Sequence, residues 1–250
     1  MTRYDFRTPR LFVDARLTPG AEIALDAAQA NYLFNVLRLR AGTSLLVFNG
    51  RDGEWQARLT AEGKKRGALV AGERTRPQPP PGDLHYLFAP LKAARLDYMV
   101  QKAVEMGASR LQPVLTQHGQ ILRVNLGRMR ANAVEAAEQC GILSLPTIGE
   151  PLTLAKAIAE IEPARLLVFC DEDAEVADPV AALAAPAPRH DAVALAVLIG
   201  PEGGFSEAER AALMKLPRVV RLSLGPRILR ADTAAVAALA LVGAVIGDWR

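Results

Sequence analysis

The chain has few residues of the types that build metal, redox and disulfide sites. It contains two cysteines and three histidines among 250 residues. Cys140 and Cys170 form no C-x-x-C pair and have no histidine at ligand spacing, so we predict reduced thiols in a cytoplasmic protein without a metal site. His85, His118 and His190 stand singly, and we interpret each as an ordinary surface or core histidine.

Long hydrophobic runs are also lacking. The first ten residues are polar and contain no apolar stretch of the kind that a secretory signal needs. The longest apolar stretch, residues 233–247, is rich in alanine, is too short to span a bilayer and lies between Asp232 and Asp248. We predict that it forms a buried helix, in the core or at a subunit interface.

Two common phosphate-binding patterns are missing. The sequence has no G-x-x-x-x-G-K-[ST] and no G-x-G-x-x-G after its first strand, which argues against P-loop and dinucleotide-binding folds. Residues 171–173 read Asp-Glu-Asp and could suggest a metal, but no partner carboxylates stand at ligand spacing. We therefore interpret this run as a solvated loop.

Positive charge is concentrated in the first third of the chain, although the net charge of the whole is only +3. Residues 1–76 contain thirteen Lys and Arg against eight Asp and Glu, whereas the remainder contains seventeen against nineteen. A basic segment of this kind is typical of a module that contacts phosphates. A solvated, arginine-rich surface would have the same composition.

Proline separates two parts of the chain that have different patterns. Four prolines between residues 77 and 81 disfavour a helix or a central strand and predict an extended linker over residues 77–82. Residues 1–76 then form a first domain, in which one helix at 27–37 and several short strands predict a small β-barrel. Its expected strands are 11–13, 22–25, 44–48, 54–59 and 67–72.

The second domain, residues 83–250, alternates strands with helices, which predicts an α/β fold with a mainly parallel sheet. Two helices are expected to end at Gly107 and Gly141, and Ser206 with Glu209 forms a capping box that begins another. The expected strands are 84–89, 111–115, 165–170, 193–199 and 219–224, and the other expected helices are 95–106, 128–140, 155–161 and 233–246.

Two of these strands are followed by glycine-containing turns that lead into helices. Residues 200–204 read GPEGG and carry no bulky side chain apart from Glu202, so ligand atoms could approach the backbone closely. Residues 223–230 follow another strand, and open α/β sheets bind ligands at the carboxyl ends of their strands. Together the turns predict one pocket for a nucleotide-like cofactor, although a simple tight turn would explain the first of them alone.

The two turns lie in longer segments that match a known family. IGPEGGFS at 199–206 and LSLGPRILRADTA at 222–234 closely resemble the small-subunit (16S) ribosomal RNA uracil-N3 methyltransferases, which belong to the trefoil-knotted SPOUT superfamily. Arginines that are common in the family are replaced at residues 118–120 and 142–143. Further matching segments are 10–13, 35–40, 102–107 and 138–141.

The resemblance implies a PUA-like N-terminal β-barrel, a trefoil-knotted C-terminal domain and a homodimer formed through the knotted domain. It also implies S-adenosyl-L-methionine as cofactor and 16S rRNA of the small ribosomal subunit as partner, with N3 of a uridine as the methylated atom. The residues assigned to the cofactor are Leu198, Ile199, Gly200, Pro201, Glu202, Gly203, Gly204, Leu222, Ser223, Leu224, Gly225, Ile228, Leu229, Arg230, Thr233 and Ala234.

The implied reaction needs control of one proton, because the N3–H of uracil is a weak acid. A nearby guanidinium would stabilise negative charge on the uracil carbonyl oxygens without losing its own proton. We predict this role for Arg230, with a salt bridge to Glu202 or Asp232 as a compatible structural role. Glu202 is the second catalytic candidate, as a hydrogen-bond acceptor or as the proton acceptor.

RNA contacts are predicted mainly in the basic first domain, at Arg10, Arg38 and Arg40, and continue with Lys92 and Lys102. Aromatic residues make up only 5% of the chain, so we expect recognition of RNA shape rather than stacking on unpaired bases. Two alternatives stay open. One is a related knotted enzyme acting on a ribose 2′-hydroxyl or a tRNA base, and the other is a non-catalytic RNA-binding or ribosome-assembly factor.

Overall fold

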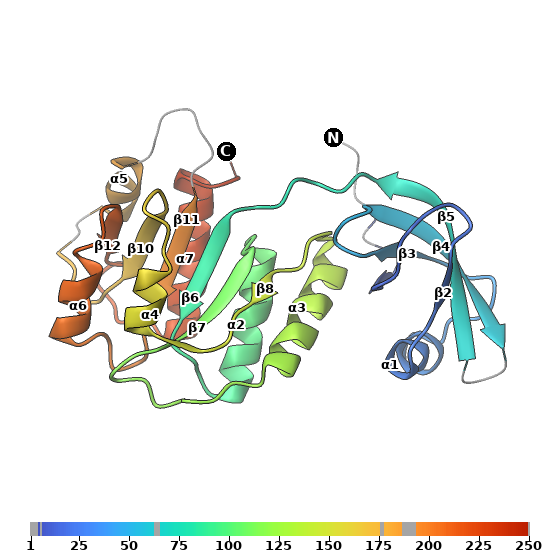
Figure 1. Cartoon of the computed structure of the whole chain (residues 1–250), viewed down its shortest axis with the longest axis horizontal. Coiled ribbons are helices and arrows are strands. Elements are labelled where there is room, and N and C mark those ends of the chain that lie inside the picture. Colours follow the sequence, from blue (N-terminus) through green and yellow to red (C-terminus); the bar gives the residue numbers. More distant parts are fainter. Residues whose placement is uncertain (1–4, 6, 63–65, 176–177, 187–193, 250) are drawn as a thin grey trace. The chain divides into compact units, whose positions relative to one another are not determined.

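The computed structural model describes residues 5, 7–62, 66–175, 178–186 and 194–249 (Figure 1). His190 and the predicted start of a strand at residue 193 lie outside these residues. The chain divides into two compact units. The first unit consists of Met1–Pro81 together with Val134–Leu145, and the second consists of Gly82–Ala133 and Pro146–Arg250.

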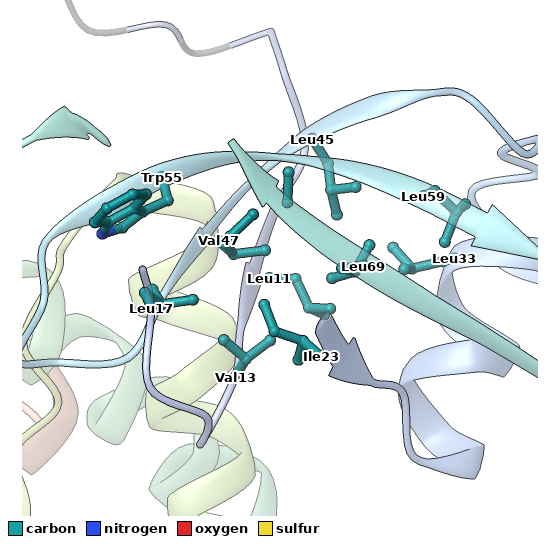
Figure 2. Close-up of a cluster of buried hydrophobic side chains, with 12 residues drawn as sticks. Leu11, Val13, Leu17, Ile23, Leu33, Leu45, Val47, Trp55, Leu59 and Leu69 are labelled. Carbon is teal, nitrogen blue, oxygen red and sulfur yellow. The ribbon is translucent and has the colours of Figure 1, made fainter. Parts of the chain in front are cut away.

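The first unit contains a five-stranded sheet in the order β1-β3-β4-β5-β2. β1 pairs with β3 in parallel, and the other neighbours are antiparallel. The β-branched and leucine side chains of alternate positions meet in one apolar core, which includes Leu33, Leu45, Leu59 and Leu69 (Figure 2). The strands are β1 (Arg10–Phe12), β2 (Glu22–Ala24), β3 (Ser44–Phe48), β4 (Glu54–Glu62) and β5 (Arg66–Arg76).

The helix predicted at 27–37 consists of two short pieces. α1 (Ala27–Asn31) begins at a capping box formed by Asp26 and Gln29 and continues into a π-helical turn over Tyr32–Val36. Leu33 in this turn is fully buried in the core of the unit. The turn ends before Arg38, which has a φ of 56° and is the one residue other than glycine with a positive φ in the described parts of the chain.

The return of the chain at 134–145 adds the end of α3 (Leu126–Cys140) to the first unit. The backbone N–H of Phe12 donates to Glu138 Oε1 at 2.9 Å, and Arg76 Nη2 donates to the carbonyl oxygen of Gly141 at 3.0 Å. The sequence-based division into residues 1–76, a linker at 77–82 and residues 83–250 does not include this return.

The second unit is built on a fully parallel sheet in the order β12-β10-β11-β6-β7-β8, with β9 pairing separately with β7. Its central strands are continuous apolar runs rather than alternating ones, because helices cover both faces. The strands are β6 (Leu84–Phe88), β7 (Arg110–Leu115), β8 (Thr147–Ile148), β9 (Leu152–Thr153), β10 (Leu166–Cys170), β11 (Leu195–Ile199) and β12 (Val219–Leu222).

The helices of this unit fall on the two faces of the sheet. α4 and α6 pack on one face around Phe169 and Leu198, whereas α2 and α7 contact each other beside β11. The alanines of α7 allow close packing, and Ala235 and Ala238 are buried. The helices are α2 (Ala93–Glu105), α3, α4 (Leu154–Ala159), α5 (Pro179–Ala184), α6 (Glu207–Leu213) and α7 (Ala231–Val245). No helix in the described parts of the chain is long and apolar enough to cross a membrane.

Candidate functional site

The loops that follow β10, β11 and β12 enclose a cavity of about 430 Å³. These three strands are parallel neighbours in the sheet, so their carboxyl ends meet at the same edge. This is the edge at which open parallel sheets bind ligands. The cavity is lined by Cys170, Asp171, Glu172, Ile199, Gly200, Pro201, Glu202, Leu222, Ser223, Leu224, Gly225, Pro226, Arg227, Ile228, Leu229, Ala231 and Ala234.

The loop after β11 is a tight turn that begins a helix. The N–H of Gly204 donates to the carbonyl oxygen of Pro201 at 3.0 Å, and Gly204 has a φ of +66°. Ser206 and Glu209 then form the predicted capping box of α6. The backbone therefore leaves the sheet and enters α6 after the seven residues 200–206, which holds residues 199–202 against the cavity.

The loop after β12 is longer and contributes the largest share of the cavity wall. It contains no regular structure between Leu222 and Ala231 and has a glycine, Gly225, at a φ of +96°. Leu222, Leu224 and Leu229 supply apolar surface. Ile228 is 92% exposed, which is unusual for a large apolar side chain.

The loop after β10 supplies the wall that sequence reasoning missed. Asp171 is only 2% exposed, and its Oδ2 accepts hydrogen bonds from Arg210 Nε at 2.9 Å and Arg221 Nε at 2.8 Å. Burial alone would raise the pKa of Asp171, but these two hydrogen bonds outweigh it and hold the pKa below its ordinary value. The interpretation of residues 171–173 as a solvated loop was wrong for Asp171, whose charge is compensated by arginines from α6 and β12.

Most of the predicted cofactor residues lie together in this cavity, and a minority do not. Those that line it are Ile199, Gly200, Pro201, Glu202, Leu222, Ser223, Leu224, Gly225, Ile228, Leu229 and Ala234. Those outside the lining are Leu198, Gly203, Gly204, Arg230 and Thr233. The lining residues that were not predicted are Cys170, Asp171, Glu172, Pro226, Arg227 and Ala231. The signal for the first three was their position at the end of a buried parallel strand, where Cys170 is the last residue of β10 and Asp171 and Glu172 follow it.

The two catalytic candidates lie at different parts of the cavity rim. Glu202 is exposed and its Oε1 lies 3.2 Å from Arg95 Nη1 at the start of α2. Arg230 is exposed and precedes α7 as its N-cap residue, between two residues that line the cavity. Among the described residues neither Glu202 nor Asp232 forms the predicted salt bridge with Arg230, so a catalytic role for Arg230 stays a prediction.

The loop after β7 contacts the glycine turn at residues 200–204. His118 Nδ1 lies 3.0 Å from the carbonyl oxygen of Gly203, and the N–H of Gln117 donates to Glu209 Oε1 at 2.8 Å. A Cβ added at Gly203 would lie 3.1 Å from His118 Cβ. Gly203 therefore leaves room for His118, and this exposed histidine contacts the backbone of the glycine turn.

The predicted RNA contacts differ in how available their charges are. Arg10 is buried at 5% exposure and its Nε donates to Glu54 Oε2 at 2.7 Å. Its guanidinium is therefore not accessible to an RNA phosphate. Lys102 lies on α2 and donates to both carboxylate oxygens of Glu105. Arg38, Arg40 and Lys92 are exposed, and their contacts with RNA stay predictions.

The thiol of Cys170 lines the cavity but is not a nucleophile. Burial raises the pKa of Cys170 to about 12, and the neighbouring charge of Asp171 acts in the same direction. Only the thiolate is reactive. Cys170 therefore contributes apolar surface to the cavity wall.

Comparison with known proteins gives the class and then the family. A family model described as an RNA methyltransferase domain matches residues 78–243, and one described as an RNA methyltransferase PUA domain matches residues 25–70. Proteins named ribosomal RNA small subunit methyltransferase E are 32% identical in Synechocystis, over 95% of this chain and 78% of the relative, and 28% identical in Rickettsia conorii, over 93% and 94%. The chain belongs to the ribosomal RNA small subunit methyltransferase E family.

Solved structures agree with this assignment over nearly the whole chain. The enzyme of this name from Neisseria gonorrhoeae, crystallised with S-adenosyl methionine, superposes with a TM-score of 0.84 at 26% identity, over 98% of this chain and 100% of that one. A Legionella pneumophila methyltransferase with bound cofactor SAM superposes with a TM-score of 0.82 at 27% identity, over 95% and 98%. The predicted combination of a parallel α/β domain with a PUA-like N-terminal domain is confirmed.

Proposed function

We propose that this rRNA methyltransferase transfers a methyl group from S-adenosylmethionine to N3 of uridine 1498 in 16S rRNA of the small ribosomal subunit. The observation that carries the proposal is the cavity formed by the loops after β10, β11 and β12. Its position matches the two sequence segments, 199–206 and 222–234, that resemble the uracil-N3 methyltransferases.

The residues around the cavity fit S-adenosylmethionine. A cavity of about 430 Å³ lies within the roughly 300–1,000 Å³ that small-molecule sites occupy. Ile199, Leu222 and Leu229 offer apolar surface for a flat base, while the loop backbones and Glu172 offer polar groups. Gly225 has no atom within 4 Å of an added Cβ, so its backbone faces open space. The cofactor bound to the two solved relatives supports this assignment.

The chemistry at uracil requires that a proton leaves N3 while the N3–carbon bond forms. S-adenosylmethionine, when bound, supplies a methyl group on a sulfonium, which is a strong electrophile. We assign to Arg230 the stabilisation of negative charge on the uracil carbonyl oxygens, because its guanidinium stays charged at all relevant pH values. Glu202 at the rim is the candidate acceptor of the proton, and release of its carboxylate from Arg95 would make it available.

The partners that we propose are the small ribosomal subunit, held through the first unit, and a second copy of the chain. A homodimer formed through the second unit would cover Ile228, which is 92% exposed at the cavity rim. Light scattering of the purified protein tests the dimer, and an Ile228→Glu variant should shift its mass to that of a monomer.

The function is tested by incubating the protein with labelled S-adenosylmethionine and small ribosomal subunits that lack the modification, followed by nucleoside mass spectrometry. Formation of 3-methyluridine is the expected result. Methylated ribose would instead favour a related knotted enzyme. Transfer of label only to tRNA, in a parallel reaction that contains tRNA in place of the subunits, would favour a tRNA-base enzyme. Absence of both transfer and cofactor binding would favour an assembly factor.

A further inference from the structure

Three carboxylates line the cavity, and they differ in how many hydrogen bonds they already accept from arginines. Asp171 is buried and receives two hydrogen bonds from arginines. Glu202 is paired with Arg95 at 3.2 Å. Glu172 is about half exposed, and its Oε1 lies at the long distance of 3.4 Å from Arg210 Nη2. Glu172 is therefore the carboxylate with most of its hydrogen-bonding capacity left for a ligand.

The glycine turn holds space for this carboxylate. A Cβ added to Gly204 would overlap Glu172 Oε1, and Gly204 also has a φ of +66° that disfavours other residues. Arg210, from α6 directly after the turn, contacts the same carboxylate oxygen, Glu172 Oε1. The carboxylate thus lies against a backbone that has no side chain and near a guanidinium that is itself hydrogen-bonded to Asp171.

We propose that Glu172 binds the ribose of the cofactor by accepting hydrogen bonds from its two adjacent hydroxyls, with Arg210 as the residue that positions it. This inference rests on the proposed use of S-adenosylmethionine. Two carboxylate oxygens match two neighbouring hydroxyl donors. The amino-acid end of the cofactor is a poorer match, because the Arg210 guanidinium that already contacts Glu172 repels a second cation such as its ammonium group.

Calorimetric binding to the full chain tests this inference. Two ligands are used: S-adenosylhomocysteine, and 5′-methylthioadenosine, which keeps the ribose but lacks the amino-acid end. Glu172→Gln should weaken both ligands by a similar factor of roughly ten or more, as expected for loss of hydrogen bonds to a charged group. Glu207→Gln, an exposed carboxylate on α6 away from the cavity, is the matched control and should bind like the unchanged chain.

The outcomes separate the inference from the proposed function. If Glu172→Gln weakens S-adenosylhomocysteine but not 5′-methylthioadenosine, the carboxylate contacts the amino-acid end and the inference is overturned. If it weakens neither while the unchanged chain binds both, the inference fails and the function stands. If the unchanged chain binds neither, both fail. Glu172→Asp, which keeps the charge but shortens the side chain, should give an intermediate loss and serves if the Gln variant does not fold.

Discussion

Buried carboxylates in both units are stabilised by pairs of arginines. In the first unit Glu54 is contacted by Arg10 and Arg76 at 2.7 and 2.6 Å, and in the second Asp171 is contacted by Arg210 and Arg221. Burial alone would raise the pKa of Glu54, but the hydrogen bonds from the two arginines hold it below its ordinary value. The stabilisation that this charge gives is present above the ordinary carboxyl pKa and is lost as the pH falls through the lower folded value.

Replacing the carboxylate of Glu54 should be costly. Glu54→Gln leaves two guanidiniums in a buried site without a negative charge, and removal of one partner of a buried ion pair typically lowers the free energy of unfolding by about 3–5 kcal/mol. Urea denaturation measures this loss. The exposed Glu22→Gln on β2 is the control and should change little; an equal effect of both variants would contradict the role of the buried pair.

Glu138 behaves in the opposite way. Burial raises its pKa to about 7 from an ordinary value of 4.5, and the charge of Glu135 adds to the shift against the hydrogen bond from Phe12. Between these two pH values the folded chain holds a proton that the unfolded chain has released, so stability falls as the pH rises.

We therefore expect Glu138→Gln to be the more stable protein at pH 8, by up to about 3 kcal/mol. The glutamine oxygen still accepts the hydrogen bond from Phe12, and the buried charge is gone. Denaturation midpoints measured from pH 5 to pH 8 should decline for the unchanged chain and stay nearly flat for the variant. Parallel profiles would show that Glu138 does not titrate in this range.

Arg230 is tested by separating binding from turnover. Arg230→Ala should keep its affinity for S-adenosylhomocysteine, since Arg230 lies outside the cavity lining. It should lose roughly 10²–10³ in kcat, the usual cost of removing one group that stabilises a developing negative charge. Lys215→Ala, exposed after α6, is the control. Unchanged turnover in the Arg230 variant would remove this residue from the mechanism.

At the scale of elements, the loop after β12 depends on the left-handed conformation of Gly225. Gly225→Ala should destabilise the chain by about 1–2 kcal/mol and also weaken cofactor binding, because the strained loop lines the cavity. Gly20→Ala is a close match, with a φ of +78° and no atom near an added Cβ, but it lies in the first unit. Gly20→Ala should lower the free energy of unfolding by a similar amount but leave cofactor binding unchanged. Calorimetric titration with S-adenosylhomocysteine distinguishes the two variants.

The same elements show what a sequence can predict. β6, β10 and β11 were located to within one or two residues because strands covered on both faces are unbroken apolar runs. α5, β8 and β9 were missed because they are too short to carry a period. The site was also predicted only where the sequence carries a local pattern. The glycine turns predicted the parts of the cavity wall after β11 and β12. Nothing in the sequence near Asp171 and Glu172 indicates that Arg210 and Arg221, from distant segments, contact the loop after β10.

At the scale of the whole molecule, the uneven charge gives a prediction about salt. Arg38→Ala with Arg40→Ala should weaken binding to small-subunit rRNA and reduce the slope of log affinity against log salt by about one per lost phosphate contact. Arg58→Ala with Arg74→Ala removes the same charge from exposed positions of β4 and β5. A filter-binding titration that gives equal slopes for the two pairs would show a general field rather than specific contacts.

Because residues 134–145 belong to the first unit, this unit is not encoded by one continuous stretch of sequence. A polypeptide that stopped at Pro81 would keep Phe12 and Arg76 but lose Glu138 and Gly141, with which they form hydrogen bonds. The first unit is therefore not one contiguous segment of the chain that a gene fusion could transfer intact. To transfer the first unit to another protein, the second half of α3 must be transferred as well. Recombination within the linker at 77–82 would therefore separate residues that belong to the same unit.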